Sequence, residues 1–198
     1  MAKKNQASET RRVKSILQES VRVKQKLLKT DLGLVARAAA LIATSLQHGG
    51  RTYFFGNGGS AGDAQHLSGE LQGRFLKERR ALAGLALTTD TSTITAVAND
   101  YSYAEVFARQ IEGLGQPGDV AIGISTSGGS KNVIKALQKA RKLGMVTIAL
   151  TGSGGGLIQK KRLADICICV PSKCTPRIQE SHITIGHAIM ELVETACA

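Results

Sequence analysis

Two amphipathic segments come before any strand-like pattern in the chain. Within residues 11–31, apolar side chains recur at intervals of three and four residues with charged residues between them, which is the spacing of one helix face. A second apolar face follows over residues 31–47, and the glycines at 49–50 end it. We therefore expect residues 1–48 to form a helical hairpin that takes part in packing or oligomerisation.

From residue 51 onward, short apolar runs alternate with segments of helical spacing. The runs begin at residues 52, 82, 119, 145 and 164. Helices are predicted between and after them, over residues 61–75, 91–97, 103–112, 130–143, 155–162 and 178–196. Near-continuous apolar runs are typical of strands buried on both faces, and their alternation with helices indicates a parallel sheet. The predicted fold is α/β, a three-layer doubly wound sheet of five parallel strands.

Length and charge narrow the class of protein. The 198 residues, 42% of them hydrophobic, suffice for one domain with one buried core. Long charge-free stretches are missing and the first residues are polar, so we expect a cytoplasmic protein that does not contact a membrane. The net charge is +11, but residues 1–30 hold nine Lys or Arg against two Glu. An excess of positive charge on one terminal helix that lacks aromatic residues indicates a solvated helix face, so nucleic acid is not an expected partner.

The cysteine pattern fits a reducing compartment. Cys167 and Cys169 alternate within the apolar run "ADICICVP", so both should lie on one face of a strand as buried thiols. A metal site that also includes Cys174 is the alternative. Paired CxxC spacing is missing, and inert thiols are therefore the favoured interpretation.

Three loops should meet at one edge of the predicted sheet, because ligands of such sheets bind beyond the carboxyl ends of the strands. They are residues 56–60, 88–92 and 125–130. The last of them holds four hydroxyl side chains, Ser125, Thr126, Ser127 and Ser130, and leads into a helix. Free backbone N–H groups and the helix dipole favour a phosphate there, whereas an ordinary N-cap needs only one serine. We predict a phosphate-binding loop.

The stretch "FFGNGGSAGDAQHLSGE" carries a different glycine-rich loop. It lacks the third glycine of a dinucleotide loop and the GK[ST] of a P-loop. Asn57 and Ser60 could donate hydrogen bonds to a polyol. His66 and Glu70 are four residues apart, so a helix would present both on one face. The sequence leaves two interpretations of this pair, metal ligands or a His–Glu hydrogen bond.

Four motifs together closely resemble the sedoheptulose 7-phosphate isomerases, also called phosphoheptose isomerases, of the sugar isomerase (SIS) domain superfamily. The motifs are "GNGGSAGDAQHLSGE", "ALTTDTSTITAVANDY", "STSGGSKN" and "PRIQESHITIGH". The resemblance implies a single flavodoxin-like SIS domain over residues 1–198 and a homotetramer with composite active sites. It also implies conversion of sedoheptulose 7-phosphate to D-glycero-D-manno-heptose 7-phosphate through an enediol, the first step towards ADP- or GDP-heptose for lipopolysaccharide core or related glycans.

The resemblance also assigns residues. It implies that Glu70 is the catalytic base and His187 the partner acid. Implied ligands of one zinc ion per subunit are His66, Glu70, Gln179 and His187. Implied substrate-binding residues are Asn57, Gly58, Gly59, Ser60, Thr89, Asp90, Asn99, Asp100, Ser125, Thr126, Ser127, Ser130 and Gln179.

The spacing of two of the implied ligands is a difficulty. Gln179 and His187 are eight residues apart, about 12 Å along an unbroken helix. Either the last helix begins after Gln179, or the site joins residues of neighbouring subunits, which is the favoured interpretation.

Alternative functions come from other classes. The resemblance also allows a non-catalytic SIS tetramer that acts as a scaffold for the replication initiator, a regulator that senses sugar phosphates, or an isomerase of another sugar phosphate. A scaffold has no chemical need for Glu70, Gln179 and His187 together. A regulator would need a DNA-binding module, and no helix-turn-helix pattern is appended here.

Overall fold

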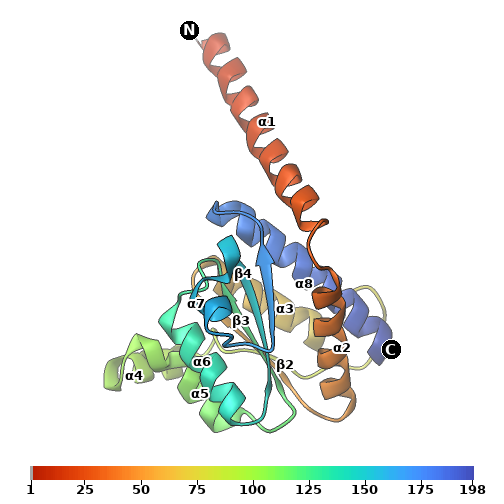
Figure 1. Cartoon of the computed structure of the whole chain (residues 1–198), viewed down its shortest axis with the longest axis vertical. Helices are drawn as coiled ribbons and strands as arrows, with labels where there is room; N and C mark the ends of the chain where they lie inside the picture. Colours follow the sequence, from red (N-terminus) through yellow and green to blue (C-terminus); the bar gives the residue numbers. More distant parts are fainter. Residues whose placement is uncertain (1) are drawn as a thin grey trace.

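A parallel sheet with helices on both faces forms the body of the protein (Figure 1), in a computed structural model that describes residues 2–198. The strands are β1 (Thr52–Gly56), β2 (Gly84–Ala86), β3 (Val120–Ser125), β4 (Val146–Gly152) and β5 (Ile166–Val170). Their order is β2-β1-β3-β4-β5, and every neighbouring pair is parallel. The predicted doubly wound α/β fold is confirmed.

The helices follow the predicted pattern with shifted ends. They are α1 (Ala2–Leu27), α2 (Gly33–Gln47), α3 (Gly59–Gln72), α4 (Thr91–Asp100), α5 (Val106–Leu114), α6 (Lys131–Lys142), α7 (Gly156–Lys160) and α8 (Thr175–Cys197), with 3₁₀ turns η1 (Tyr103–Glu105) and η2 (Ser153–Gly155). Helix α8 begins earlier than predicted because a proline occupies its first turn, where the missing N–H costs no hydrogen bond.

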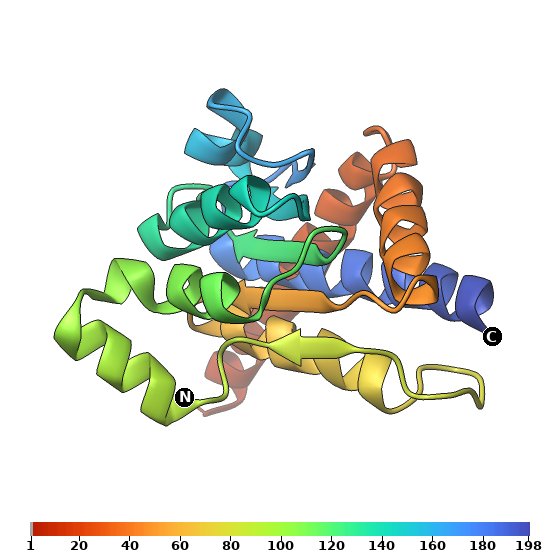
Figure 2. The same cartoon turned by 90° about the horizontal axis from the view of Figure 1, so that it is seen from below.

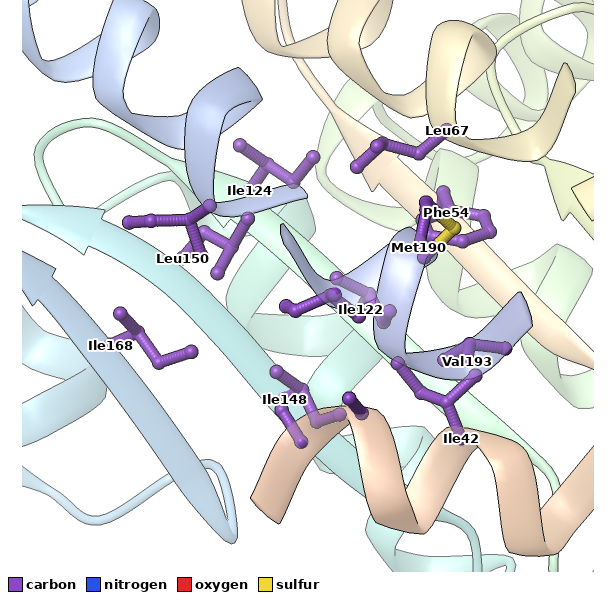
Figure 3. Close-up of a cluster of buried hydrophobic side chains, with 14 of the residues drawn as sticks. Ile42, Phe54, Leu67, Ile122, Ile124, Ile148, Leu150, Ile168, Met190 and Val193 are labelled. Carbon is purple, nitrogen blue, oxygen red and sulfur yellow. The ribbon is translucent and has the colours of Figure 1, made fainter. Parts of the chain in front are cut away.

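Alternate side chains of the strands supply two cores, one on each face of the sheet. Phe54, Ile122 and Leu150 belong to a cluster with residues of α2, α3 and α8 (Figure 3). Their neighbours Tyr53 and Phe55 belong to a second cluster, with residues of α5, α6 and α7. Burial on both faces explains why these strands read as nearly continuous apolar runs.

Helix α1 differs from the prediction. It extends away from the body and does not fold back on α2 (Figure 1), so the expected hairpin is wrong although the helical N-terminus is confirmed. The reason is that the apolar face of α2 is already buried in the core beside α8. The last turns of α1 contact the core through Val23 and Leu27. None of the helices in the described part of the chain combines the length and apolarity needed to cross a bilayer.

Strand β5 lies at one edge of the sheet, and this position changes the expectation for its cysteines. Its buried residues alternate with half-buried ones, which include Cys167 and Cys169. The two thiols share one face, as predicted. Full burial was the wrong expectation, because β5 has a neighbouring strand on one side only.

A buried ion pair joins the ends of α3 and α8. The Glu194 carboxylate on α8 accepts hydrogen bonds of 2.8–2.9 Å from the backbone N–H groups of residues 75–77. Its Oε1 lies 3.3 Å from Arg79 Nε, and both side chains are only 2% exposed. Arg79 also donates to the backbone carbonyl of Glu70. The segment after α3 is therefore tied to α8 on one side and to the turn that carries Glu70 on the other.

The environment of Glu194 lowers its pKa. Burial alone would raise the pKa of this carboxyl, but the amide donors of residues 75–77 and the Arg79 guanidinium together outweigh burial. A lowered folded-state pKa means that the carboxylate stabilises the fold above its unfolded pKa, and that this contribution is lost as the pH falls through the folded-state pKa.

We expect Glu194→Gln to destabilise the protein by about 3 kcal/mol at neutral pH, because Arg79 is left buried without its counter-charge. The measurement is urea denaturation over a series of pH values. The difference from the unsubstituted protein should shrink on acidification. Glu191→Gln, an exposed position on the same helix, is the matched control and should change little. A destabilisation that stays constant with pH would contradict this account.

Candidate active site

The carboxyl ends of β1 and β3 lie side by side at the centre of the sheet, with β2 beyond one and β4 beyond the other. The strand order therefore reverses between them, and in such sheets ligands bind in the crevice at this point. The loop after β1 leads into α3, and the loop after β3 leads into α6. Both loops therefore lie at one rim of the sheet, as predicted, and the loop after β1 contacts the first turn of α6.

The loop over residues 125–130 has the geometry of an anion site. Ser125 Oγ and Ser130 Oγ lie 2.9 Å apart, and Ser127 Oγ accepts a hydrogen bond from the Gly129 N–H. Ser127 is exposed at the tip of the loop. The side chain of Ser130 precedes α6 without capping its backbone. The Val133 N–H donates to Asn132 Oδ1, so it is the N–H groups of Lys131 and Asn132 that can donate to an anion.

Gly128 is required for the shape of this loop. Its φ is +62°, in the left-handed region, and a Cβ at this position would overlap the carbonyl of Gly155 in η2. The Ile158 N–H donates to the Gly128 carbonyl at 3.1 Å. The phosphate loop is thus packed directly against the segment that joins β4 to α7.

Asn57 joins the loop after β1 to the first turn of α6. Its Nδ2 donates to Asn132 Oδ1 at 2.9 Å, and Asn132 Nδ2 donates back to Asn57 Oδ1 at 2.8 Å. The Tyr103 hydroxyl donates to the same Asn57 oxygen at 3.1 Å. The oxygen and one N–H of the amide that the sequence assigned to the sugar therefore already have protein partners. The sequence interpretation missed Asn132 and Tyr103, although Asn132 is only two residues beyond the phosphate loop.

His66, Glu70 and His187 form a second polar cluster. Helix α3 presents His66 and Glu70 on one face, with His66 Nε2 3.1 Å from Glu70 Oε1. Helix α8 brings His187 Nε2 to 2.9 Å from His66 Nε2. Gly186 allows this approach, because a Cβ there would come within 2.7 Å of the Leu67 side chain. The ring of Phe75 lies 5.6 Å from that of His187 and covers one side of it.

This cluster also fits a metal ion. One ligand atom from each of the three side chains lies within 4.8 Å of the other two. Imidazole nitrogen and carboxylate oxygen are ligands that zinc accepts, and three of them leave a coordination position for another group. The His66 side chain is 49% exposed and that of Glu70 20%, so the cluster is accessible from outside. The distances are compatible with both interpretations of His66 and Glu70, a pair of metal ligands and a hydrogen-bonded pair.

Gln179 is separated from this cluster within one chain. Helix α8 runs unbroken from Thr175, so a helix that begins after Gln179 is ruled out. The Gln179 amide packs against Gly59 at the start of α3, where a Cβ would overlap it. Helices α3 and α8 run parallel, because Gln179 near the start of α8 contacts Gly59 at the start of α3. Further along both helices, His187 contacts His66. Gln179 thus lies near the first glycine-rich loop, about 12 Å from the level of His187.

The remaining predicted residues flank α4. Asp90 caps this helix by accepting hydrogen bonds from Thr93, which lower the pKa of its carboxyl. Asn99 donates to Asp100 at the other end. Figure 2 shows α4 projecting beyond the carboxyl ends of the strands. These side chains and that of Thr89 are exposed, on the side of the sheet where the phosphate loop lies but without a contact that joins them to it in the described structure.

A cavity of 950 Å³ lies apart from these clusters, between α3 and the edge strand β2. Gln65, Ser68 and Leu85 are among its lining residues, and of the predicted site residues it includes Thr89. Its walls include neither the phosphate loop nor the histidines. The cavity is therefore not the centre of the candidate site.

Known proteins share this fold and sequence over nearly the whole chain. The SIS domain family matches residues 17–152. A phosphoheptose isomerase of Aquifex aeolicus is 52% identical over 183 residues, which cover 92% of this chain and 95% of that protein. The solved structure of a phosphoheptose isomerase from Neisseria gonorrhoeae has a TM-score of 0.88 at 42% identity and that from Francisella tularensis 0.90 at 35%, each covering 94% of this chain and 98% of the other. The chain therefore belongs to the SIS domain family and, within it, to the phosphoheptose isomerases.

Proposed function

We propose that this protein is a ketose–aldose isomerase that converts sedoheptulose 7-phosphate to D-glycero-D-manno-heptose 7-phosphate. Relatives named phosphoheptose isomerase, about half of whose aligned residues are identical, support the reaction class. The observation that carries the chemistry is the convergence of Glu70 and His187 from two helices, 117 residues apart in sequence. A carboxylate and an imidazole in contact range are the groups that proton transfer between adjacent carbons requires.

Glu70 and His187 would divide the proton transfers. The Glu70 carboxylate removes a proton from C1 of the ketose while His187 protonates the oxygen on C2, which gives the enediol. Glu70 then returns its proton to C2, and His187 takes the proton from the oxygen on C1. The product is the aldose, with both residues back in their starting protonation states. The hydrogen bond between His66 and His187 would orient the imidazole for this exchange.

His66, Glu70 and His187 are also the residues that would hold zinc, with Gln179 of another subunit as a further ligand. When bound, a zinc ion polarises the substrate carbonyl and stabilises negative charge on its oxygen. Glu70 would then be both a metal ligand and the proton-transfer group. The nitrogen and oxygen donors of the cluster support this proposal.

The phosphate end of the substrate would bind at Ser125, Thr126, Ser127 and Ser130. Glu70 follows Gly59 by eleven residues on α3, about 16 Å along the helix away from the rim. A seven-carbon chain with bonds of about 1.5 Å spans less than about 9 Å from C1 to C7, and the phosphoester and the Glu70 side chain would span the rest. The unbroken helix α8 keeps Gln179 about 12 Å from the level of His187, which supports a composite site to which neighbouring subunits contribute.

Helix α1 supports the assembly that such a site needs. Val13, Leu17 and Val21 follow one another at four-residue intervals and are 54–61% exposed. An apolar stripe of this kind on a projecting helix is typical of a surface covered by another chain. We propose that residues 1–48 contribute to a homotetramer of single SIS domains. The free thiols fit the cytoplasmic location expected for it.

Glu70→Gln and His187→Gln should each lower kcat for sedoheptulose 7-phosphate by about 10²–10⁴-fold, because each removes a proton-transfer group. Product formation is followed by NMR, and the oligomeric mass is checked for each variant. Glu191→Gln removes the same charge as Glu70→Gln at an exposed position outside the site, and as the control it should keep full activity. Full activity of Glu70→Gln would refute the mechanism, and inactivity of the unsubstituted protein on every ketose phosphate would favour the scaffold.

Ser127→Ala should weaken phosphate binding with little change in kcat. Loss of one hydrogen bond to a charged group corresponds to about 1.5–3 kcal/mol, or roughly a ten- to hundredfold rise in KM. Steady-state kinetics measure KM, and Ser15→Ala on α1, an exposed serine outside the site, is the control. An unchanged KM would remove Ser127 from the phosphate site.

Leu17→Asp should disrupt the assembly, because it places a charge in the proposed α1 interface. Light scattering should show a lower oligomeric mass, and activity should fall with it because the site is composite. Glu19→Gln, also exposed on α1 but off the stripe, should keep both. A variant of lower mass with full activity would contradict the composite site.

A further inference from the structure

The half-buried thiols of β5 form a compact cluster with one hydroxyl. Cys167 Sγ and Cys169 Sγ lie 3.8 Å apart. The Thr151 hydroxyl on β4 lies 3.2 Å from Cys169 Sγ and 3.6 Å from Cys167 Sγ. None of the three belongs to the machinery assigned to isomerisation. Three ligand atoms of this kind within contact distance form a potential metal site.

The thiols of this cluster share a proton unequally. Hydrogen bonds from the Cys167 thiol and the Thr151 hydroxyl lower the pKa of Cys169 to about 6, against the opposing effect of burial. The same contact with Cys169, together with burial, raises the pKa of Cys167. The thiolate is the form that binds metals, so the contacts that lower the pKa of Cys169 favour this sulfur as a ligand.

The sulfur spacing matches that of a metal-bound pair. Two zinc–sulfur bonds of about 2.3 Å at a tetrahedral angle place their sulfur atoms about 3.8 Å apart, which is the separation found here. We propose that Cys167 and Cys169 bind a thiophilic metal ion at a site separate from His66, Glu70 and His187. Binding forms two metal–sulfur bonds and releases the thiol protons of the two ligands to solvent, without any change of oxidation state. The Thr151 hydroxyl or water completes the coordination.

This site is connected to the phosphate loop. Ser125, Thr151 and Cys169 are register partners on three neighbouring strands, β3, β4 and β5. Cys169 Sγ also lies 3.0 Å from the position of a Cβ on Gly155, and the Gly155 carbonyl packs tightly against Gly128. A metal ion on Cys169 would press on Gly155 and, through it, on the phosphate loop. Metal binding should therefore weaken binding of the sugar phosphate.

Titration of the reduced protein with Cd²⁺ tests the site. Thiolate–Cd²⁺ bonds absorb in the ultraviolet, whereas imidazole and carboxylate ligands add no such band, so the histidine cluster does not interfere. We expect the band to saturate at one equivalent of Cd²⁺ per chain. It should be lost in Cys167→Ser and in Cys169→Ser and kept in the matched control Cys174→Ser. No band in the unsubstituted protein, or an equal band in Cys169→Ser, would overturn the site.

Alkylation of the unsubstituted protein gives a second test that does not depend on variants folding. Iodoacetamide labelling is quantified at each cysteine by mass spectrometry. Cd²⁺ should protect Cys167 and Cys169 and leave the rate at Cys174 unchanged. Equal rates at Cys167 and Cys169 with and without Cd²⁺ would overturn the proposal.

The connection to the phosphate loop rests on the proposed isomerase function and is tested separately. Cd²⁺ should raise KM for sedoheptulose 7-phosphate by at least about fivefold in the unsubstituted protein, and by less in a Cys167→Ser, Cys169→Ser double variant. An equal rise in both proteins would place the effect at the histidine cluster and refute the connection. The absorption band is read without turnover, so failure of the isomerase assignment would leave the test of the metal site intact.

Discussion

The close parallel packing of α3 against α8 is the contact on which the candidate chemistry depends. Gly186 lets the Leu67 side chain lie against the backbone of α8, and this approach puts His66 and His187 within hydrogen-bond distance. The Gln179–Gly59 contact fixes one end of the helix pair, and the buried Glu194 carboxylate fixes the other. A larger residue at position 186 would separate the helices, since packed cores relax only partially.

The same packing separates two functions in space. The phosphate loop lies at the rim of the sheet, where free N–H groups at a helix start attract an anion. The His66–Glu70–His187 cluster lies two to three turns down α3 from that rim, on the outer side of the helix pair. In the proposed composite site, these two clusters would come together from different copies of the chain, and the exposed apolar stripe of α1 would contribute to the contact between the copies.

Hydrogen bonds between side chains hold the loops at the rim of the sheet in place without a bound ligand. Asn57 and Asn132 satisfy each other's amides, and Tyr103 adds a third bond. On the opposite side, η2 lies between the phosphate loop and the thiols of β5. The phosphate loop is thus held by two neighbours. The Asn57–Asn132 pair is fixed by its mutual hydrogen bonds, whereas η2 also packs against the half-buried Cys169.

Local pattern in the sequence determined the strands, the helices and their order, because side-chain periods of 2 and 3.6 residues depend only on the backbone. It also determined the hydroxyl-rich loop and the shared face of His66 and Glu70. Only the tertiary structure decided that α1 projects, that Asn57 pairs with Asn132, and that Cys167 and Cys169 are half-buried. The meeting of His187 with His66 was implied by the family resemblance, but no local pattern in the chain predicts it. These outcomes depend on which faces the other elements have already covered, and contacts across 121 residues leave no periodic trace in the chain.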